Sequence, residues 1–167
     1  MQSVSLNKKR HQRKNFDCGV EALNNYLKLM AHQHATKDNS RTYVVEDSQN
    51  EGIIAGFYTL TMITIEFTAL PRYLQNRHHP NHTAGLIARL AVDKRYAKRG
   101  IGSWLLVDAL KKLLVASDTV GFPMVVVDAK EGVGSFYEQF GFQPFHEEKE
   151  RLFMPVADIR VSFGDDG

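Results

Sequence analysis

The chain has 167 residues, and 21 basic against 19 acidic side chains leave it a formal net charge of only +2 at pH 7. Its 43% hydrophobic and 24% charged residues are typical of an ordinary soluble globular protein, and no apolar run approaches the roughly 20 residues that would cross a bilayer. We expect one domain over residues 1–167, because a chain of roughly this length can bury about two-thirds of its unfolded surface around a single core.

Basic residues are concentrated near the N-terminus. They are Lys8, Lys9, Arg10, Arg13 and Lys14. No apolar stretch of the kind found in a secretory signal follows them, so we expect a cytoplasmic protein. A single cysteine, Cys18, excludes an internal disulfide and agrees with a reducing compartment. A short basic run either binds a polyanion or is a solvated segment without a partner, and the sequence leaves both open.

An amphipathic helix is predicted over residues 18–34. Apolar residues recur there with a spacing of three and four, which places them on one helical face. They are Val20, Leu23, Leu27 and Met30. Asp17 stands just before this segment, where its side chain is placed to cap the start of the helix.

A β-hairpin is predicted next. Residues 41–46 and 53–67 are rich in β-branched and aromatic side chains, and the polar segment 47–52 between them is typical of a turn. The polar stretch 75–85 then predicts a loop or a short helix. It is followed by residues 86–92, which predict a mostly buried strand.

A second helix is predicted from Ile101 onward, because apolar residues recur on one of its faces. They are Leu105, Leu106, Ala109, Leu110, Leu113 and Leu114. Asp108, Lys111 and Lys112 lie at positions that point away from this face. The helix should therefore bury one side against a sheet.

The last third of the chain alternates strand and helix. Residues 122–127 form a continuous apolar run that fits a central strand buried on both faces. Residues 131–140 predict a helix that Gly141 closes as a C-cap, and a last strand is expected near 151–154. The order of elements predicts an α/β fold, in which helices cover the faces of a mixed sheet.

A basic loop with two glycines joins the predicted strand 86–92 to the following helix. Gly100 and Gly102 let backbone N–H groups approach a phosphate, while the helix dipole, Lys98 and Arg99 add positive charge. The segment therefore predicts a site for an anion such as a pyrophosphate. The alternative is that both glycines serve only a tight strand-to-helix turn. The third glycine of a dinucleotide-binding fingerprint and the Gly-Lys-Ser/Thr of a P-loop are both absent.

These segments together resemble the GNAT superfamily of N-acetyltransferases over about residues 40–155. The resemblance is carried by Leu90-Ala-Val-Asp93, Arg99-Gly-Ile-Gly102, Phe136-Tyr137 and Gly141-Phe142. It implies a single-domain fold whose mixed central sheet is splayed near its middle and flanked by helices. It also implies that acetyl-coenzyme A is the cosubstrate, lies in the splay and has its pyrophosphate wrapped by the basic loop.

Acetyl transfer to an amine needs a polarised thioester carbonyl and an acid for the departing thiolate. Tyr137 is the expected general acid, because its reference pKa near 10 keeps it protonated at neutral pH. The alternative is a core tyrosine packed among phenylalanines. Backbone N–H groups near the end of the strand 86–92 are expected to hold the carbonyl oxygen. The expected cofactor contacts are Leu90, Ala91, Val92, Ala97, Lys98, Arg99, Gly100, Ile101, Gly102, Ser103 and Phe136.

A second resemblance extends over nearly the whole chain. The segments Phe16-Asp-Cys-Gly19, Ala22-Leu-Asn24, Arg41-Thr-Tyr43, Gly56-Phe-Tyr-Thr-Leu60 and Arg89-Leu-Ala-Val-Asp93 look like those of acetyltransferase toxins from type II toxin–antitoxin modules. This implies acetylation of the α-amino group of aminoacyl-tRNA, a block of translation, a ribbon-helix-helix antitoxin as partner and a homodimer. The residues expected to contact tRNA are Lys8, Lys9, Arg10, Arg77 and Arg89.

Two other functions stay open. One is an N-acetyltransferase of a small-molecule amine or a protein N-terminus. The other is a non-catalytic acyl-coenzyme A or RNA-binding module, against which the presence of Tyr137 argues. A metal site is not expected, because His78, His79 and His82 surround Pro80 without a nearby acidic ligand and so favour a solvated loop.

Overall fold

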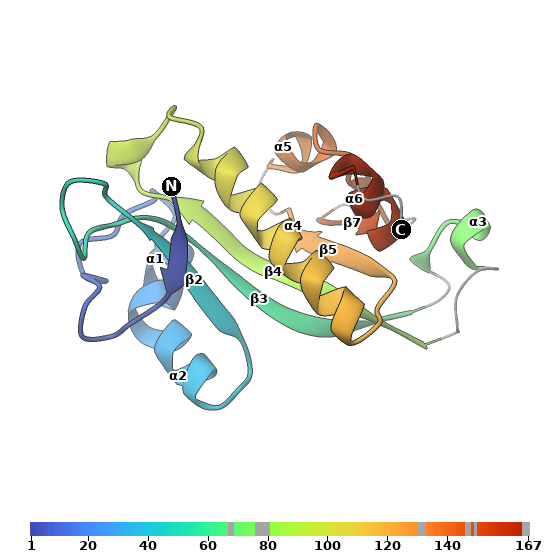
Figure 1. The fold of residues 1–167 in the computed structure, drawn as a ribbon, viewed down its shortest axis with the longest axis horizontal. Coiled ribbons are helices and arrows are strands. Elements are labelled where there is room, and N and C mark those ends of the chain that lie inside the picture. The colour runs from blue at the N-terminus through green and yellow to red at the C-terminus, as the bar shows by residue number, and fades with distance from the viewer. Residues whose placement is uncertain (67–68, 76–80, 130–132, 146–147, 149, 165–167) are drawn as a thin grey trace. The chain divides into compact units, whose positions relative to one another are not determined.

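Seven strands form one mixed sheet in the order β1-β2-β3-β4-β5-β7-β6, with helices between them along the chain (Figure 1). The structure is a computed structural model that describes residues 1–66, 69–75, 81–129, 133–145, 148 and 150–164, with residues 81 and 82 described by their backbone alone. The predicted α/β fold with a mixed sheet is confirmed.

The chain forms two compact units. The first unit comprises Met1–Thr61 and Ala88–Ala109, and the second comprises Met62–Ile87 and Leu110–Gly167. Strands β3 and β4 and helix α4 each contribute residues to both. That residues 1–167 act as one domain stays a prediction.

The antiparallel part of the sheet in the first unit contains the predicted hairpin. Strand β2 (Arg41–Glu46) pairs with β3 (Ile54–Glu66), so both predicted strands are confirmed. A short strand β1 (Ser3–Ser5) pairs with the outer side of β2. Strand β1 was not predicted, because three residues are too few to show an alternating pattern.

The N-terminal helical segment has three consecutive parts, and its last part packs against β2 (Figure 1). They are α1 (Glu21–Asn25), the π-helical η1 (Tyr26–Met30) and α2 (Ala31–Thr36). The predicted helix is therefore confirmed, but its predicted buried face is only partly right. Val20 and Met30 are 40% and 45% exposed. A π-turn holds more residues than an α-turn, so it shifts the buried face to Tyr26, Leu27 and Ala31.

The predicted cap of this helix by Asp17 is wrong. The residue at the N-cap position is Val20, and no side chain caps the helix there. The Asp17 carboxylate instead accepts hydrogen bonds from the backbone N–H of Gly19, at 2.9 Å, and from the side-chain amide of Asn24, at 3.0 Å. Asp17 thus organises the turn that precedes the helix.

Strand β4 (Asn81–Val92) leads through the short 3₁₀-helix η3 (Lys94–Tyr96) into α4 (Ile101–Thr119). The strand begins earlier than predicted, since residues 81–85 were expected in a loop or helix. The predicted buried face of α4 is confirmed for Leu105, Leu106, Ala109, Leu110 and Leu113, whereas Leu114 is half-buried. Asp108 does not simply point away, because it accepts hydrogen bonds from Tyr58 and Ser3.

The second unit holds the strands at the other side of the sheet. Strand β5 (Met124–Asp128) runs parallel to residues 85–87 of β4 and antiparallel to β7 (Arg151–Pro155), which also pairs with β6 (Gln143–Pro144). Strands β5 and β7 match the prediction closely, whereas β6 is too short to be recognised from sequence.

Besides its part of α4, the second unit contains three helices in the described residues. They are α3 (Arg72–Gln75), α5 (Gly134–Glu138) and α6 (Val156–Ser162). The helix predicted over 131–140 is confirmed at Gly134–Glu138, but its C-cap is Gln139 and not Gly141. Gly141 has a φ of 101°, and its N–H donates to the carbonyl of Glu138 at 3.0 Å in the turn that follows the helix. Helix α6 was not predicted. No helix in the described part of the chain is long and apolar enough to cross a membrane.

Candidate active site

The loop between η3 and α4 has the geometry expected of an anion site. Lys98 and Gly100 have φ angles of 62° and 77°, so the backbone turns sharply just before the helix. A Cβ atom at Gly100 would meet nothing within 4 Å, so the φ angle and not crowding favours glycine there. Residues 97–100 are exposed and leave the helix start accessible.

The first backbone N–H groups of α4 are available to a ligand. The first intrahelical bond runs from the N–H of Trp104 to the carbonyl of Gly100, at 3.1 Å. The N–H groups of Ile101, Gly102 and Ser103 precede it, and such groups have no carbonyl partner within a helix. Because the helix dipole is positive at this end, the groups favour a phosphate.

Asp93 anchors the loop at its start. Its carboxylate is 1% exposed and accepts two hydrogen bonds from the Arg95 guanidinium, both 3.0 Å long, and one from the Arg95 backbone N–H, at 2.9 Å. Burial alone would raise the pKa of Asp93, but these bonds, together with one from the backbone of Asp17, hold its pKa below the ordinary value. The motif that contains Asp93 gave no sign of this role, since Asp17 is 76 positions away in the chain.

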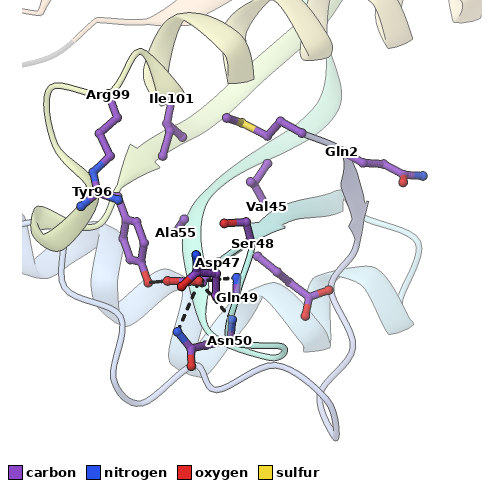
Figure 2. A pocket seen from close by; sticks show the side chains of 12 residues that line it. Gln2, Val45, Asp47, Ser48, Gln49, Asn50, Ala55, Tyr96, Arg99 and Ile101 are labelled. Atoms are coloured by element: carbon purple, nitrogen blue, oxygen red, sulfur yellow. Dashed lines mark hydrogen bonds between the residues drawn. The ribbon is translucent and has the colours of Figure 1, made fainter.

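Arg99 lies against an aromatic ring on one side of the loop (Figure 2). Its guanidinium carbon is 5.3 Å from the centre of the Tyr96 ring, and the Tyr96 hydroxyl donates a hydrogen bond to Asp47 on the β2–β3 turn. That hydrogen bond raises the pKa of Tyr96. These residues line a hollow of about 550 Å³. Arg99 is thus held at the edge of this hollow by a cation–π contact.

The end of β4 extends beyond its pairing with β5. The parallel pairs join Gly85–Ile87 to Val125–Val127, whereas β4 continues to Val92. Leu90 and Val92 are half-buried in this extension, and Ala91 between them is buried in the core beside Phe16 and Leu27. The expected carbonyl-binding residues therefore stand where the strand leaves its parallel neighbour.

Tyr137 belongs to the second unit and is packed among aromatic rings. Its side chain is 5% exposed, and its ring centre lies 5.1 Å from that of Phe136 and 5.8 Å from that of Phe142. Burial, aided by the negative charge of Asp128, raises the pKa of Tyr137 to about 12. Within the described residues, no group hydrogen-bonds the Tyr137 hydroxyl. The hydroxyl is therefore a protonated donor that no residue in the described ranges uses.

The structure separates the predicted tRNA-binding residues into different environments. Lys8 and Lys9 are exposed on a turn in which the Asn7 carboxamide accepts the backbone N–H groups of Lys9 and Arg10. Arg10 forms ion pairs with Glu46 and Glu51, both at 2.8 Å, so acidic partners offset its charge. The sequence pattern gave no sign of this pairing, because Glu46 is 36 positions away.

Arg89 is also engaged within the protein. Its guanidinium carbon is 4.5 Å from the centre of the buried Tyr26 ring, and it donates to the carbonyl of Ala88 at 3.0 Å. Arg77 lies outside the described residues, as do His78 and His79 of the histidine-rich segment. Across the ranges that the structure describes, no three His, Cys, Asp or Glu side chains are grouped to hold a metal ion.

The sequence and structure of this chain are similar to those of known acetyltransferases. Residues 38–144 match the family model for an acetyltransferase (GNAT) domain. A probable toxin TacT of Sinorhizobium fredii is 31% identical over 95% of this chain and 93% of its own length. The solved structure of AtaT complexed with acetyl-methionyl-tRNA has a TM-score of 0.89 at 28% identity, covering 97% of this chain and 98% of that one.

A second solved structure shows a tyrosine-to-phenylalanine variant of the AtaT toxin bound to the C-terminus of the antitoxin AtaR and to acetyl-coenzyme A. It has a TM-score of 0.83 at 27% identity and covers 97% of each chain. The similarity to these proteins therefore includes residues of both compact units.

Proposed function

Because the chain belongs to the GNAT family of N-acetyltransferases, which use acetyl-coenzyme A, we propose that it is a toxin that acetylates aminoacyl-tRNA. The acceptor would be the α-amino group of the esterified amino acid, and its acetylation would block translation. The observation that carries the proposal is similarity to toxins of this kind over nearly the whole chain, as with AtaT bound to acetyl-methionyl-tRNA.

The loop before α4 would hold the pyrophosphate of acetyl-coenzyme A. The backbone N–H groups of residues 100–103 would bind its oxygens, and the charges of Lys98 and Arg99 would offset its negative charge. Ala97 contributes no side-chain donor, so its contact would be through the backbone. Exposure of residues 97–100 and the positive φ angles of Lys98 and Gly100 support this role. Phe136, which is half-buried, is a further expected contact of the cofactor.

The reaction is a direct transfer. An α-amino group has a pKa of about 8, so an appreciable neutral fraction attacks the thioester carbon at pH 7 without a strong base. Backbone N–H groups of Leu90, Ala91 and Val92 would stabilise the negative charge on the carbonyl oxygen. As the carbon–sulfur bond breaks, Tyr137 would donate its proton to the thiolate and regain one from solvent, while the new amide releases the amine proton to water.

Partners follow from the same proposal. We expect Lys8 and Lys9, whose side chains are exposed, to contact phosphates of the tRNA, and Arg10 to contribute less because it is ion-paired. We also expect Arg89, whose guanidinium lies beside the Tyr26 ring, to contact the tRNA. We also propose that the protein forms a homodimer, has a ribbon-helix-helix antitoxin as its partner and is located in the cytoplasm.

Transfer of labelled acetyl to tRNA tests the proposed function. Purified protein and acetyl-coenzyme A are incubated with charged tRNA, with uncharged tRNA and with small amines, and the Tyr137→Phe variant is assayed beside the wild type. We expect label on charged tRNA alone and little with the variant. Label on small amines or on protein N-termini, with none on charged tRNA, would replace the toxin function by the broader acetyltransferase one.

A further inference from the structure

The N-terminal segment is attached directly to the start of the cofactor loop. The backbone N–H of Asp17 donates to the buried carboxylate of Asp93 at 3.0 Å, and the backbone N–H of Lys94 donates to the carbonyl of Asp17 at 2.9 Å. Asp17 and Asp93 are 76 positions apart in the chain. Asp17 is thus bonded through its N–H and its carbonyl to the N-cap and the first residue of η3, the short helix that leads into the loop.

Asn24 fixes the conformation of Asp17. The Asn24 side-chain N–H donates to the Asp17 carboxylate at 3.0 Å, and its side-chain oxygen accepts the backbone N–H of Cys18 at 2.9 Å. Asn24 is 9% exposed, so water competes weakly for these bonds. The position needs one donor and one acceptor on a short side chain, which asparagine provides and aspartate does not.

The turn at Gly19 lies against Lys94, the first residue of η3. Gly19 has a φ of 89°, and its backbone N–H donates to the same Asp17 carboxylate oxygen that Asn24 contacts. A Cβ atom at Gly19 would lie 2.9 Å from the Lys94 side chain, and the Lys94 ammonium is 3.7 Å from the Asp17 carboxylate. The N–H of Gly19 is the largest cause of a lowered pKa of Asp17, so the carboxylate stays ionised at neutral pH.

We propose that Asn24 is a positioning residue for acetyl-coenzyme A. It touches no cofactor, but through Asp17 it holds Asp93 and Lys94, and with them the loop that carries Lys98 and Arg99. The inference rests on the proposed role of this loop in binding the pyrophosphate. Without the Asn24 amide, Asp17 would lose the orientation that both of its backbone bonds require, and the loop would sample conformations that bind the cofactor poorly.

Binding of acetyl-coenzyme A to two aspartate variants tests this role. Asn24→Asp keeps the size of the side chain but loses the donor and places two carboxylates together. Asn25→Asp is the matched control, because Asn25 is the exposed next residue of α1 and gains the same charge. Calorimetry should show Kd raised about tenfold for Asn24→Asp, which corresponds to about 1.4 kcal/mol, and within about twofold of wild type for Asn25→Asp.

Amide hydrogen exchange separates positioning from general destabilisation. In Asn24→Asp, the N–H groups of Asp17 and Lys94 should exchange faster, while those of β2 and β3 keep their wild-type rates. Unchanged cofactor binding, or faster exchange throughout the chain, would overturn the proposal.

A second pair of variants tests the same role if Asn24→Asp does not fold. Asp17→Asn keeps an oxygen acceptor and should bind the cofactor within about twofold of wild type, whereas Asp17→Ala should show the tenfold loss. Equal Kd values for Asp17→Asn and Asp17→Ala would contradict the role given to the Asp17 side chain. No assay here contains tRNA, so the outcome is independent of whether tRNA is the acceptor.

Discussion

The loop before α4 is held by hydrogen bonds to a charged carboxylate, whereas Tyr137 is held by aromatic packing. Asp93 at the start of the loop accepts bonds from the Arg95 side chain and from two backbone N–H groups. Tyr137 has phenylalanine rings around it, and no described residue bonds its hydroxyl. A loop that binds charged phosphates needs fixed polar atoms, while a proton donor needs a hydroxyl that is free to act. Stability and activity should therefore be linked in the first region and separable in the second.

The largest effect that we predict is on the rate of the Tyr137→Phe variant. The value of kcat should fall about 10²–10⁴-fold, because the general acid is lost. The free energy of unfolding should stay at the wild-type value, because no hydrogen bond within the described protein is lost. Steady-state kinetics and urea unfolding measure the two quantities. A variant that retains its activity would show that Tyr137 is a packing residue alone.

The dependence of the rate on pH also tests Tyr137 as the proton donor. The ester of aminoacyl-tRNA lowers the pKa of its amine below the value of about 8 of a free α-amino group, and below that lowered pKa the rate should rise about tenfold per pH unit, because only the neutral amine attacks. The pKa of Tyr137 is raised to about 12, so its protonated form persists and the rate should not fall between pH 8 and about 10. Kinetics under saturating acetyl-coenzyme A measure this profile. A decline of kcat within that range would assign the donor to another group.

Tyr58→Phe should have the opposite effect to Tyr137→Phe. The buried Tyr58 hydroxyl donates to the Asp108 carboxylate at 2.5 Å, and burial together with this bond raises the pKa of Tyr58. Its loss should lower the free energy of unfolding by about 1.5–3 kcal/mol, as for hydrogen bonds to charged groups. The value of kcat at a temperature where the variant is folded should stay within about twofold. A large fall in kcat with normal stability would place Tyr58 in the chemistry.

The smallest effect that we predict is on cofactor affinity when Lys98 is replaced. Lys98→Gly removes a charge but permits the φ of 62°, so KM for acetyl-coenzyme A should rise about threefold at low salt without loss of stability. Lys98→Ala removes the same charge but keeps a Cβ atom at this φ, as lysine does, so its melting temperature should lie below that of Lys98→Gly, which relieves strain of about 1 kcal/mol. Equal melting temperatures for the two variants would contradict the role of this backbone conformation.

Local patterns in the sequence determined the elements and the chemical type of the loop. Strand β2 begins and ends at the predicted residues, and the buried face of α4 follows the predicted spacing. Both succeed because alternating or helical periodicity records which side chains a single element buries. Glycines at 100 and 102 beside basic residues likewise predict an exposed turn at a helix start, since the backbone and the charges that it needs are adjacent in the chain.

The hydrogen bonds and ion pairs between distant polar groups could be seen only in the tertiary structure. Asp17 was expected to cap a helix and instead joins Asn24 to Asp93, and Arg10 was expected to bind RNA and is ion-paired with Glu46. A single π-turn also moved Met30 out of the core. Hydrogen bonds and ion pairs between distant segments depend on how the strands and helices pack, and no local period encodes that packing. The sequence therefore determined the kinds of element and predicted the kind of site, and the fold determined the contacts between distant segments.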